Sequence, residues 1–202
     1  MTQVVVARLD PGPEETRSLR DLLSDAERER ADRFRFAHHR RRFIVARARL
    51  REFLAARLGV HPERVELEHG ANGKPWLAPR FAHTGWRFNV SHCDDVAVYA
   101  FSQGKDVGVD VEAIRPVQEA DAIAAQFFSD GEREAYAALS PRRRVLGFLR
   151  LWTRKEAFVK ALGAGFSMPP ESVDLSSAPS GWSVRSFFPV PGFIAALARH
   201  HG

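Results

Sequence analysis

Two acids, Asp110 and Glu112, lie in the stretch GVDVEAIRP between Gly108 and Pro116. Valines at positions 107, 109 and 111 alternate with them, which predicts a strand with its apolar residues on one face and its acids on the other. The two Cα atoms would then lie about 7 Å apart, where like charges repel by about 2 kcal/mol at an effective dielectric of about 20. Because two acids placed side by side in this way destabilise the strand, we expect them to serve a common purpose.

A third acid occurs in the helical pattern FLRLWTRKEAFVKALG. On a helical wheel Lys155 falls inside the apolar arc, Glu156 lies at its edge, and Lys160 follows Glu156 by one turn. A simple i,i+4 Glu-Lys pair, with Lys155 reaching past its apolar neighbours, would be the ordinary explanation. Here, however, the charges intrude on the arc that faces the core, whereas Arg150 and Arg154 already occupy the solvent face.

We therefore expect Asp110, Glu112 and Glu156 to converge on a hard divalent cation. Three carboxylates suit Mg²⁺, which keeps its other coordination positions for water and a substrate phosphate. The cation would also remove the repulsion between the acids. Lys155, Lys160 and a basic segment elsewhere in the chain would hold a polyphosphate, and this combination is typical of phosphoryl transfer.

The composition is that of an ordinary globular protein, with 202 residues, 45% hydrophobic and 27% charged. Its net charge of +5 is uneven, because residues 28–57 contain eleven arginines against three acids. Such a segment favours an anionic partner, although a solvated helix face rich in arginine would look the same.

Cys93 is the single cysteine, which excludes an intrachain disulfide and a cysteine-based zinc site and fits a cytoplasmic protein. The first residues predict a strand rather than a signal peptide or membrane helix.

The elements that must position these residues are helices and hairpin strands. Capping-box patterns at residues 24–27 and 129–132 predict helices reaching about residues 36 and 139, and periodicity predicts long helices at about 40–58 and 141–162. Strands are expected at 4–9, 65–68, 86–90, 96–101 and 107–112 and again after residue 172, with a turn at residues 72–73. This mixture predicts an α+β fold with antiparallel sheets, divided into residues 1–103 and 104–202.

Together, GVDVE and LWTRKEAFVK resemble the two signature motifs of the 4′-phosphopantetheinyl transferases, most closely the larger, pseudo-dimeric Sfp type. The segments RRRFIVARARLR, GKPWL and FNVSH agree with that resemblance, which runs from about residue 28 to residue 166. It implies two similar α/β subdomains with antiparallel sheets, packed as a pseudo-dimer with coenzyme A (CoA) in the cleft between them. It also implies Mg²⁺-dependent transfer of phosphopantetheine from CoA to a serine of an acidic apo acyl or peptidyl carrier protein, with release of adenosine 3′,5′-bisphosphate.

The resemblance also assigns roles to individual residues. The implied Mg²⁺ ligands are Asp110, Glu112 and Glu156, and Glu156 is also the candidate base, directly or through a water. The implied CoA contacts are Lys160 and Lys155 at the pyrophosphate, Ser91 and His92 near the 3′-phosphate, Lys74 near the adenine, and Arg42 and Arg30 in the basic segment. Glu27 departs from the pattern, since some members carry a basic residue at that position.

Two other functions fit part of the pattern. A Mg²⁺-dependent nuclease would use acids, a lysine and a basic surface, but restriction-type nucleases carry their lysine on the strand, and this strand has none. A non-catalytic RNA-binding module would use the arginine-rich helix, but it leaves the three acids unexplained and no stacking motif is evident. We expect a monomeric cytoplasmic enzyme with no nucleic-acid or membrane partner.

Overall fold

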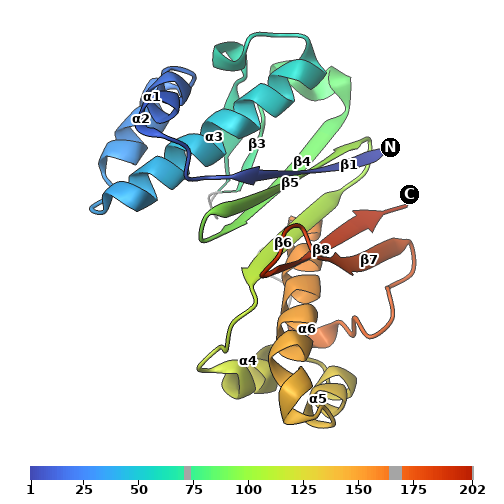
Figure 1. The fold of residues 1–202 in the computed structure, drawn as a ribbon. Helices are drawn as coiled ribbons and strands as arrows, with labels where there is room; N and C mark the ends of the chain where they lie inside the picture. The colour runs from blue at the N-terminus through green and yellow to red at the C-terminus, as the bar shows by residue number, and fades with distance from the viewer. Residues whose placement is uncertain (71–73, 164–169, 202) are drawn as a thin grey trace. The chain divides into compact units, whose positions relative to one another are not determined.

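The computed structural model describes residues 1–70, 74–163 and 170–201. It contains helices and antiparallel sheets intermixed along the chain, which confirms the α+β fold class (Figure 1). The chain forms two compact units: a larger unit (residues 1–4, 87–93 and 98–202) and a smaller unit (residues 5–86 and 94–97). The division into residues 1–103 and 104–202 stays a prediction. Within the described residues, no helix combines the length and apolar character needed to cross a bilayer.

The strands form three sheets. The first has the strand order β1-β5-β4, with β1 at Thr2–Arg8, β5 at Val96–Gln103 and β4 at Trp86–Cys93. A two-stranded sheet pairs β2 (Leu67–His69) with β3 (Pro75–Leu77), and the turn predicted at residues 72–73 lies outside the described residues. The third sheet has the order β6-β8-β7, with β6 at Val107–Ala113, β8 at Phe193–His200 and β7 at Trp182–Phe187.

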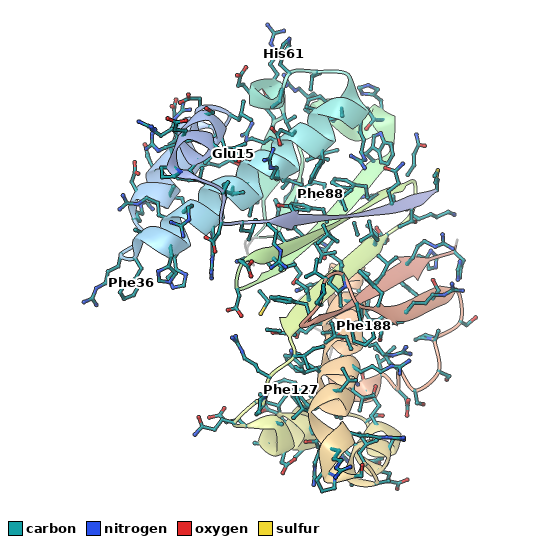
Figure 2. All side chains as sticks on the ribbon, viewed as in Figure 1. Glu15, Phe36, His61, Phe88, Phe127 and Phe188 are labelled. Carbon is teal, nitrogen blue, oxygen red and sulfur yellow. The ribbon has the colours of Figure 1, made fainter. Side chains whose placement is uncertain are left out.

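The smaller unit is built on α3 (Ala37–Leu58), which ends at Gly59 in the left-handed conformation that glycine adopts without strain. Helices α1 (Pro13–Asp21) and α2 (Asp25–Asp32) pack against α3. The predicted capping box opens α2, because the Ser24 side chain accepts from the Glu27 backbone N–H while the Glu27 carboxylate accepts from the Ser24 N–H. Phe36, which precedes α3, is 52% exposed (Figure 2).

Glu27 also forms an ion pair that neither the capping-box pattern nor the family resemblance predicted. Its carboxylate forms a buried ion pair with Arg51, with Oε2 2.7 Å from Arg51 Nε, and Arg51 Nη1 donates to the carbonyls of Pro62 and Val65. A buried charge needs a partner and hydrogen bonds to offset its desolvation. Glu27 therefore holds α2, α3 and the segment after α3 together.

In the larger unit, α6 (Pro141–Leu162) lies across the sheet β6-β8-β7, and α4 (Ala120–Phe127) and α5 (Asp130–Ala137) lie beside the N-terminal half of α6 (Figure 1). Aromatic rings join these helices: Phe128 packs on Tyr136 and Phe148, and Phe127, labelled in Figure 2, packs edge-on against Trp152. The capping box predicted at residues 129–132 is present at the start of α5. Ser140 is the N-cap residue of α6, as expected, but its side chain makes no capping hydrogen bond.

Candidate active site

Strand β6 has the alternation predicted from its sequence, but both of its faces are covered. Val107, Val109 and Val111 are buried on one face, and Asp110, on the opposite face, is also buried, with only 4% of its surface exposed. Glu112 is half-buried. Helix α6 packs against β6 and covers the face that carries the acids. The acids therefore face a helix rather than open solvent.

Gly108 explains how α6 approaches the acids so closely. It shares their face of β6, and a Cβ atom at this position would lie 2.0 Å from the carbonyl oxygen of Ala157 and 2.5 Å from the backbone nitrogen of Ala161. Any side chain at residue 108 would therefore push the helix backbone away. The helix carries Glu156 and Lys160 on the turn that passes over this glycine.

Lys160 reaches the β6 acids directly. Its Nζ donates to Asp110 Oδ1 at 2.6 Å and to the Ser91 hydroxyl at 3.1 Å. The Ser91 hydroxyl in turn donates to Asp110 Oδ1 at 2.8 Å. The other oxygen of Asp110, Oδ2, is buried and has no hydrogen-bond partner among the described residues. An unsatisfied buried carboxylate oxygen is costly, so a cation or a hydrogen-bond donor that contacts this oxygen would stabilise it.

The pKa values of the two other acids are shifted by burial and by neighbouring charges. Burial raises the pKa of Glu112, the charge of Asp110 raises it further, and a hydrogen bond from Cys93 lowers it. Burial also raises the pKa of Glu156, whereas Lys160 lowers it and the charges of Asp110 and Glu112 raise it. Glu112 and Glu156 therefore both experience the negative charge of Asp110, and a bound cation would relieve this repulsion.

The donor set fits a hard cation. Carboxylate oxygens are the ligands that Mg²⁺ prefers, and the buried Asp110 Oδ2 still lacks a partner within the described residues. Within those same residues, no three His, Cys, Asp or Glu side chains are placed together so that they could hold a metal ion, so the three acids do not form a complete site by themselves. An ion held by few protein ligands that keeps several waters is the usual arrangement for Mg²⁺.

The structure does not bring Lys155 to this group. Its side chain is 2% exposed, and its Nζ donates to Glu132 Oε2 at 2.5 Å and to the Val173 carbonyl at 2.7 Å. Glu132 is itself fully buried and also accepts from the Leu175 backbone N–H. An ammonium buried in this way holds α5, α6 and the segment before β7 together. The expected contacts of Lys155 and Lys160 with the pyrophosphate stay predictions.

The two neighbouring residues of the FNVSH segment lie differently. Ser91 is buried beside Asp110, and its hydroxyl donates to that carboxylate. His92 follows it on β4 and is exposed, because alternate residues of a strand face opposite ways. Ser91 thus contacts Asp110 directly, and the CoA contacts expected for Ser91 and His92 stay predictions.

Three other predicted residues belong to the smaller unit. Arg42 donates through Nε and Nη2 to Asp10 Oδ2, at 3.1 and 2.9 Å. Arg30 is exposed, with its guanidinium 5.3 Å from the centre of the Phe43 ring. Lys74 is half-buried just before β3. Their roles toward CoA stay predictions.

Sequence reasoning missed two residues of β4 that contact β6. The Asn89 side chain accepts from the Val109 backbone N–H at 3.0 Å, and Cys93 Sγ donates to Glu112 Oε2 at 3.4 Å. The spacing N-x-S-x-C, which puts Asn89, Ser91 and Cys93 on one face of a strand, is the signal that could have found them.

Comparisons with known proteins show the family of this chain. The family model described as 4′-phosphopantetheinyl transferase superfamily matches residues 106–198, and the one described as 4′-phosphopantetheinyl transferase, N-terminal, matches residues 7–104. The 4′-phosphopantetheinyl transferase HetI of Nostoc sp. is 36% identical over 199 residues, 94% of this chain and 84% of that protein. The 4′-phosphopantetheinyl transferase psf-1 of Bacillus pumilus is 34% identical over 151 residues, 74% of this chain and 61% of that protein. Because the match to HetI spans nearly the whole chain, this protein belongs to the 4′-phosphopantetheinyl transferase family of enzymes.

Proposed function

We propose that this enzyme transfers the 4′-phosphopantetheine group of CoA to a serine of an acidic apo acyl or peptidyl carrier protein. The serine oxygen attacks the phosphorus that bears the pantetheine arm. The bond from that phosphorus to the bridging oxygen of the pyrophosphate breaks, and adenosine 3′,5′-bisphosphate leaves with the electron pair. The serine proton passes to a base of the enzyme. Family membership supports this reaction, and the arrangement of acids and Lys160 supports its site.

Asp110, Glu112 and Glu156 would hold the Mg²⁺ ion. When bound, the ion supplies positive charge to the pyrophosphate oxygens and offsets the repulsion among the three acids. The buried Asp110 Oδ2, which has no hydrogen-bond partner in the described part of the chain, is the observation that carries this assignment. Lys160 and Ser91 both contact the other oxygen, Oδ1, and thereby fix the orientation of the carboxylate.

Glu156 is the proposed base, accepting the serine proton directly or through a water. It lies on α6, the helix that covers the β6 acids, and its carboxylate interacts electrostatically with both of them. Lys160, one turn further along α6, would place its ammonium on the phosphate that leaves. Charge that develops during the reaction is best stabilised by a group already held in position, and the hydrogen bonds of Lys160 to Asp110 and Ser91 hold it.

The CoA contacts proposed for the smaller unit are Arg42, Arg30 and Lys74. Asp10 orients the Arg42 guanidinium through two of its nitrogen atoms. Because a guanidinium carries five N–H donors, this pair leaves capacity for a phosphate. Asp10 also lowers the net charge around Arg42, so the proposed phosphate contact would be weaker than that of an isolated arginine. His92 is proposed at the 3′-phosphate on the resemblance of FNVSH alone.

The test incubates the purified chain with an apo acyl carrier protein, CoA and Mg²⁺ and measures the mass of the carrier. We expect the mass to rise by one phosphopantetheine group, the rise to disappear in EDTA, and excess Mg²⁺ to restore it. A carrier whose acceptor serine is changed to alanine is the control. Near-normal transfer in EDTA would refute the metal-dependent mechanism.

The same preparation separates the rival functions. Cleavage of plasmid DNA with Mg²⁺, without any mass change of the carrier, would identify a nuclease. Retention of RNA, without cleavage or transfer, would identify a binding module. The cytoplasmic location and monomeric state expected from the sequence stay predictions.

A further inference from the structure

Three side chains on one face of β4 hydrogen-bond to successive points along β6. These strands belong to different sheets, so their contact is made by side chains rather than by a backbone ladder. The three residues, alternate along β4, are Asn89, Ser91 and Cys93. Because alternate residues of a strand share a face, β4 presents a row of polar groups to β6.

Asn89 and Ser91, the first two residues of this row, hold the backbone of β6 and the side chain of Asp110 in place. The Asn89 carbonyl oxygen accepts from the Val109 backbone N–H at 3.0 Å, and the Ser91 hydroxyl donates to Asp110 Oδ1 at 2.8 Å. Both polar residues of β4 are buried, so these bonds are made away from bulk water. These two hydrogen bonds therefore fix the alignment of β4 with β6 next to Glu112, the second acid.

Cys93 is the third member, and it contacts β6 twice. Its thiol donates to Glu112 Oε2 at 3.4 Å, and its sulfur accepts from the Ala113 backbone N–H at 3.4 Å. The backbone contact fixes the sulfur, and the fixed sulfur then restricts the rotation of the Glu112 carboxylate. Rotation about the last bond of a glutamate is otherwise broad. The thiol thus determines where the second oxygen of Glu112 points.

An independent observation indicates that a ligand belongs at this face. Asp110, two residues before Glu112 and on the same side of β6, is buried and has its Oδ2 atom without a hydrogen-bond partner within the described residues. Its Oδ1 atom is held by Ser91, just as Glu112 Oε2 is held by Cys93. In both acids one oxygen is held by β4, and this leaves the other oxygen for a cation.

We propose that Cys93 is a positioning residue that orients Glu112 for cation binding. The inference rests on the proposed function, because it assumes that Glu112 is a cation ligand. Groups that hydrogen-bond to metal ligands typically change metal affinity about 10- to 100-fold when they are removed. The bond from a thiol is weak, so we expect Cys93→Ala to lower the affinity for a divalent cation about tenfold. Cys93→Ser, whose hydroxyl can donate and accept in the same way, should stay within about threefold of the unchanged protein.

The experiment measures Mn²⁺ binding to the full chain without CoA, by electron paramagnetic resonance and by calorimetry. The variants are Cys93→Ala, Cys93→Ser, Glu112→Gln and the Cys93→Ala/Glu112→Gln double variant. Val90→Ala, a truncation three residues before Cys93 and on the opposite face of β4, is the matched control. Cys93→Val keeps the volume and strand preference of the site without a donor, and it answers the same question if Cys93→Ala folds poorly.

Support requires weakened Mn²⁺ binding in Cys93→Ala, recovery in Cys93→Ser and no effect in Val90→Ala. The double variant should bind no more weakly than Glu112→Gln alone, because Cys93 acts only through that carboxylate. If the unchanged protein transfers phosphopantetheine and Cys93→Ala and Cys93→Val bind Mn²⁺ normally, the inference is wrong and the proposed function stands. If the unchanged protein neither binds Mn²⁺ nor modifies a carrier, the proposed function fails and the inference fails with it.

Discussion

Gly108→Ala tests how closely α6 must approach β6. A Cβ atom at residue 108 would lie 2.0 Å from the carbonyl oxygen of Ala157, 2.5 Å from the nitrogen of Ala161 and 2.9 Å from its Cα. All three are backbone atoms of the helix, so no side-chain rotation can relieve the contact. Carbon and oxygen atoms ordinarily approach to about 3.3 Å, and α6 must therefore move by about 1 Å.

That displacement should affect both stability and catalysis. Overpacking of a core typically costs about 1–3 kcal/mol of unfolding free energy. For a chain of this size each kcal/mol corresponds to about 2–4 °C in the melting temperature, so Tm should fall by about 2–12 °C. Because α6 carries Glu156 and Lys160, the same displacement moves both away from the β6 acids, and a misplacement of about 1 Å can cost about 100-fold in rate.

The measurements are thermal unfolding and kcat for carrier modification. Gly147→Ala is the matched control, because it makes the same substitution within α6, and its Cβ would meet only the far end of the flexible Leu139 side chain. Since alanine also favours a helix by about 1 kcal/mol, that variant should keep its stability within about 1 kcal/mol and its full activity. If Gly108→Ala retained both Tm and kcat, the close approach of α6 would not be what assembles the site.

Two further variants separate the roles of the lysines. Lys160→Met should lower kcat by about 100-fold with little change in the KM for CoA, the scale of losing one transition-state donor, and an effect on KM alone would make Lys160 a binding residue. Lys155→Met leaves the buried Glu132 carboxylate without its partner and should cost about 3–5 kcal/mol in urea unfolding, whereas Glu132→Gln/Lys155→Met should recover much of that loss. A raised KM for CoA with normal stability in Lys155→Met would instead support the predicted role of Lys155 at the pyrophosphate.

Local patterns were sufficient for much of the fold and for the choice of acids. The alternation of β6, the long helices α3 and α6 and the capping boxes before α2 and α5 were predicted because each depends on residues within a few positions of one another. The α+β class followed from their order along the chain. The expectation that Asp110 and Glu156 act together rested on charges that intrude on faces meant for the core.

Boundaries and weakly periodic elements were predicted less well. Helices α1 and α4 were missed, and α2 ends at Asp32 rather than near Phe36. Each of these helices has only eight or nine residues, so too few turns exist for a clear apolar stripe. Their helical state depends on packing against α3 and α6 and on neighbouring loops.

By itself, the sequence determined which side chains could do chemistry, because residue type and spacing are local properties. Only the tertiary structure decided their partners. Lys160 meets Ser91 across 69 positions of the chain, and the buried carboxylate that pairs with Lys155 comes from a capping residue of another helix. Such pairs depend on which surfaces close against each other and on the need of each buried charge for a partner, and no short stretch of sequence carries that information.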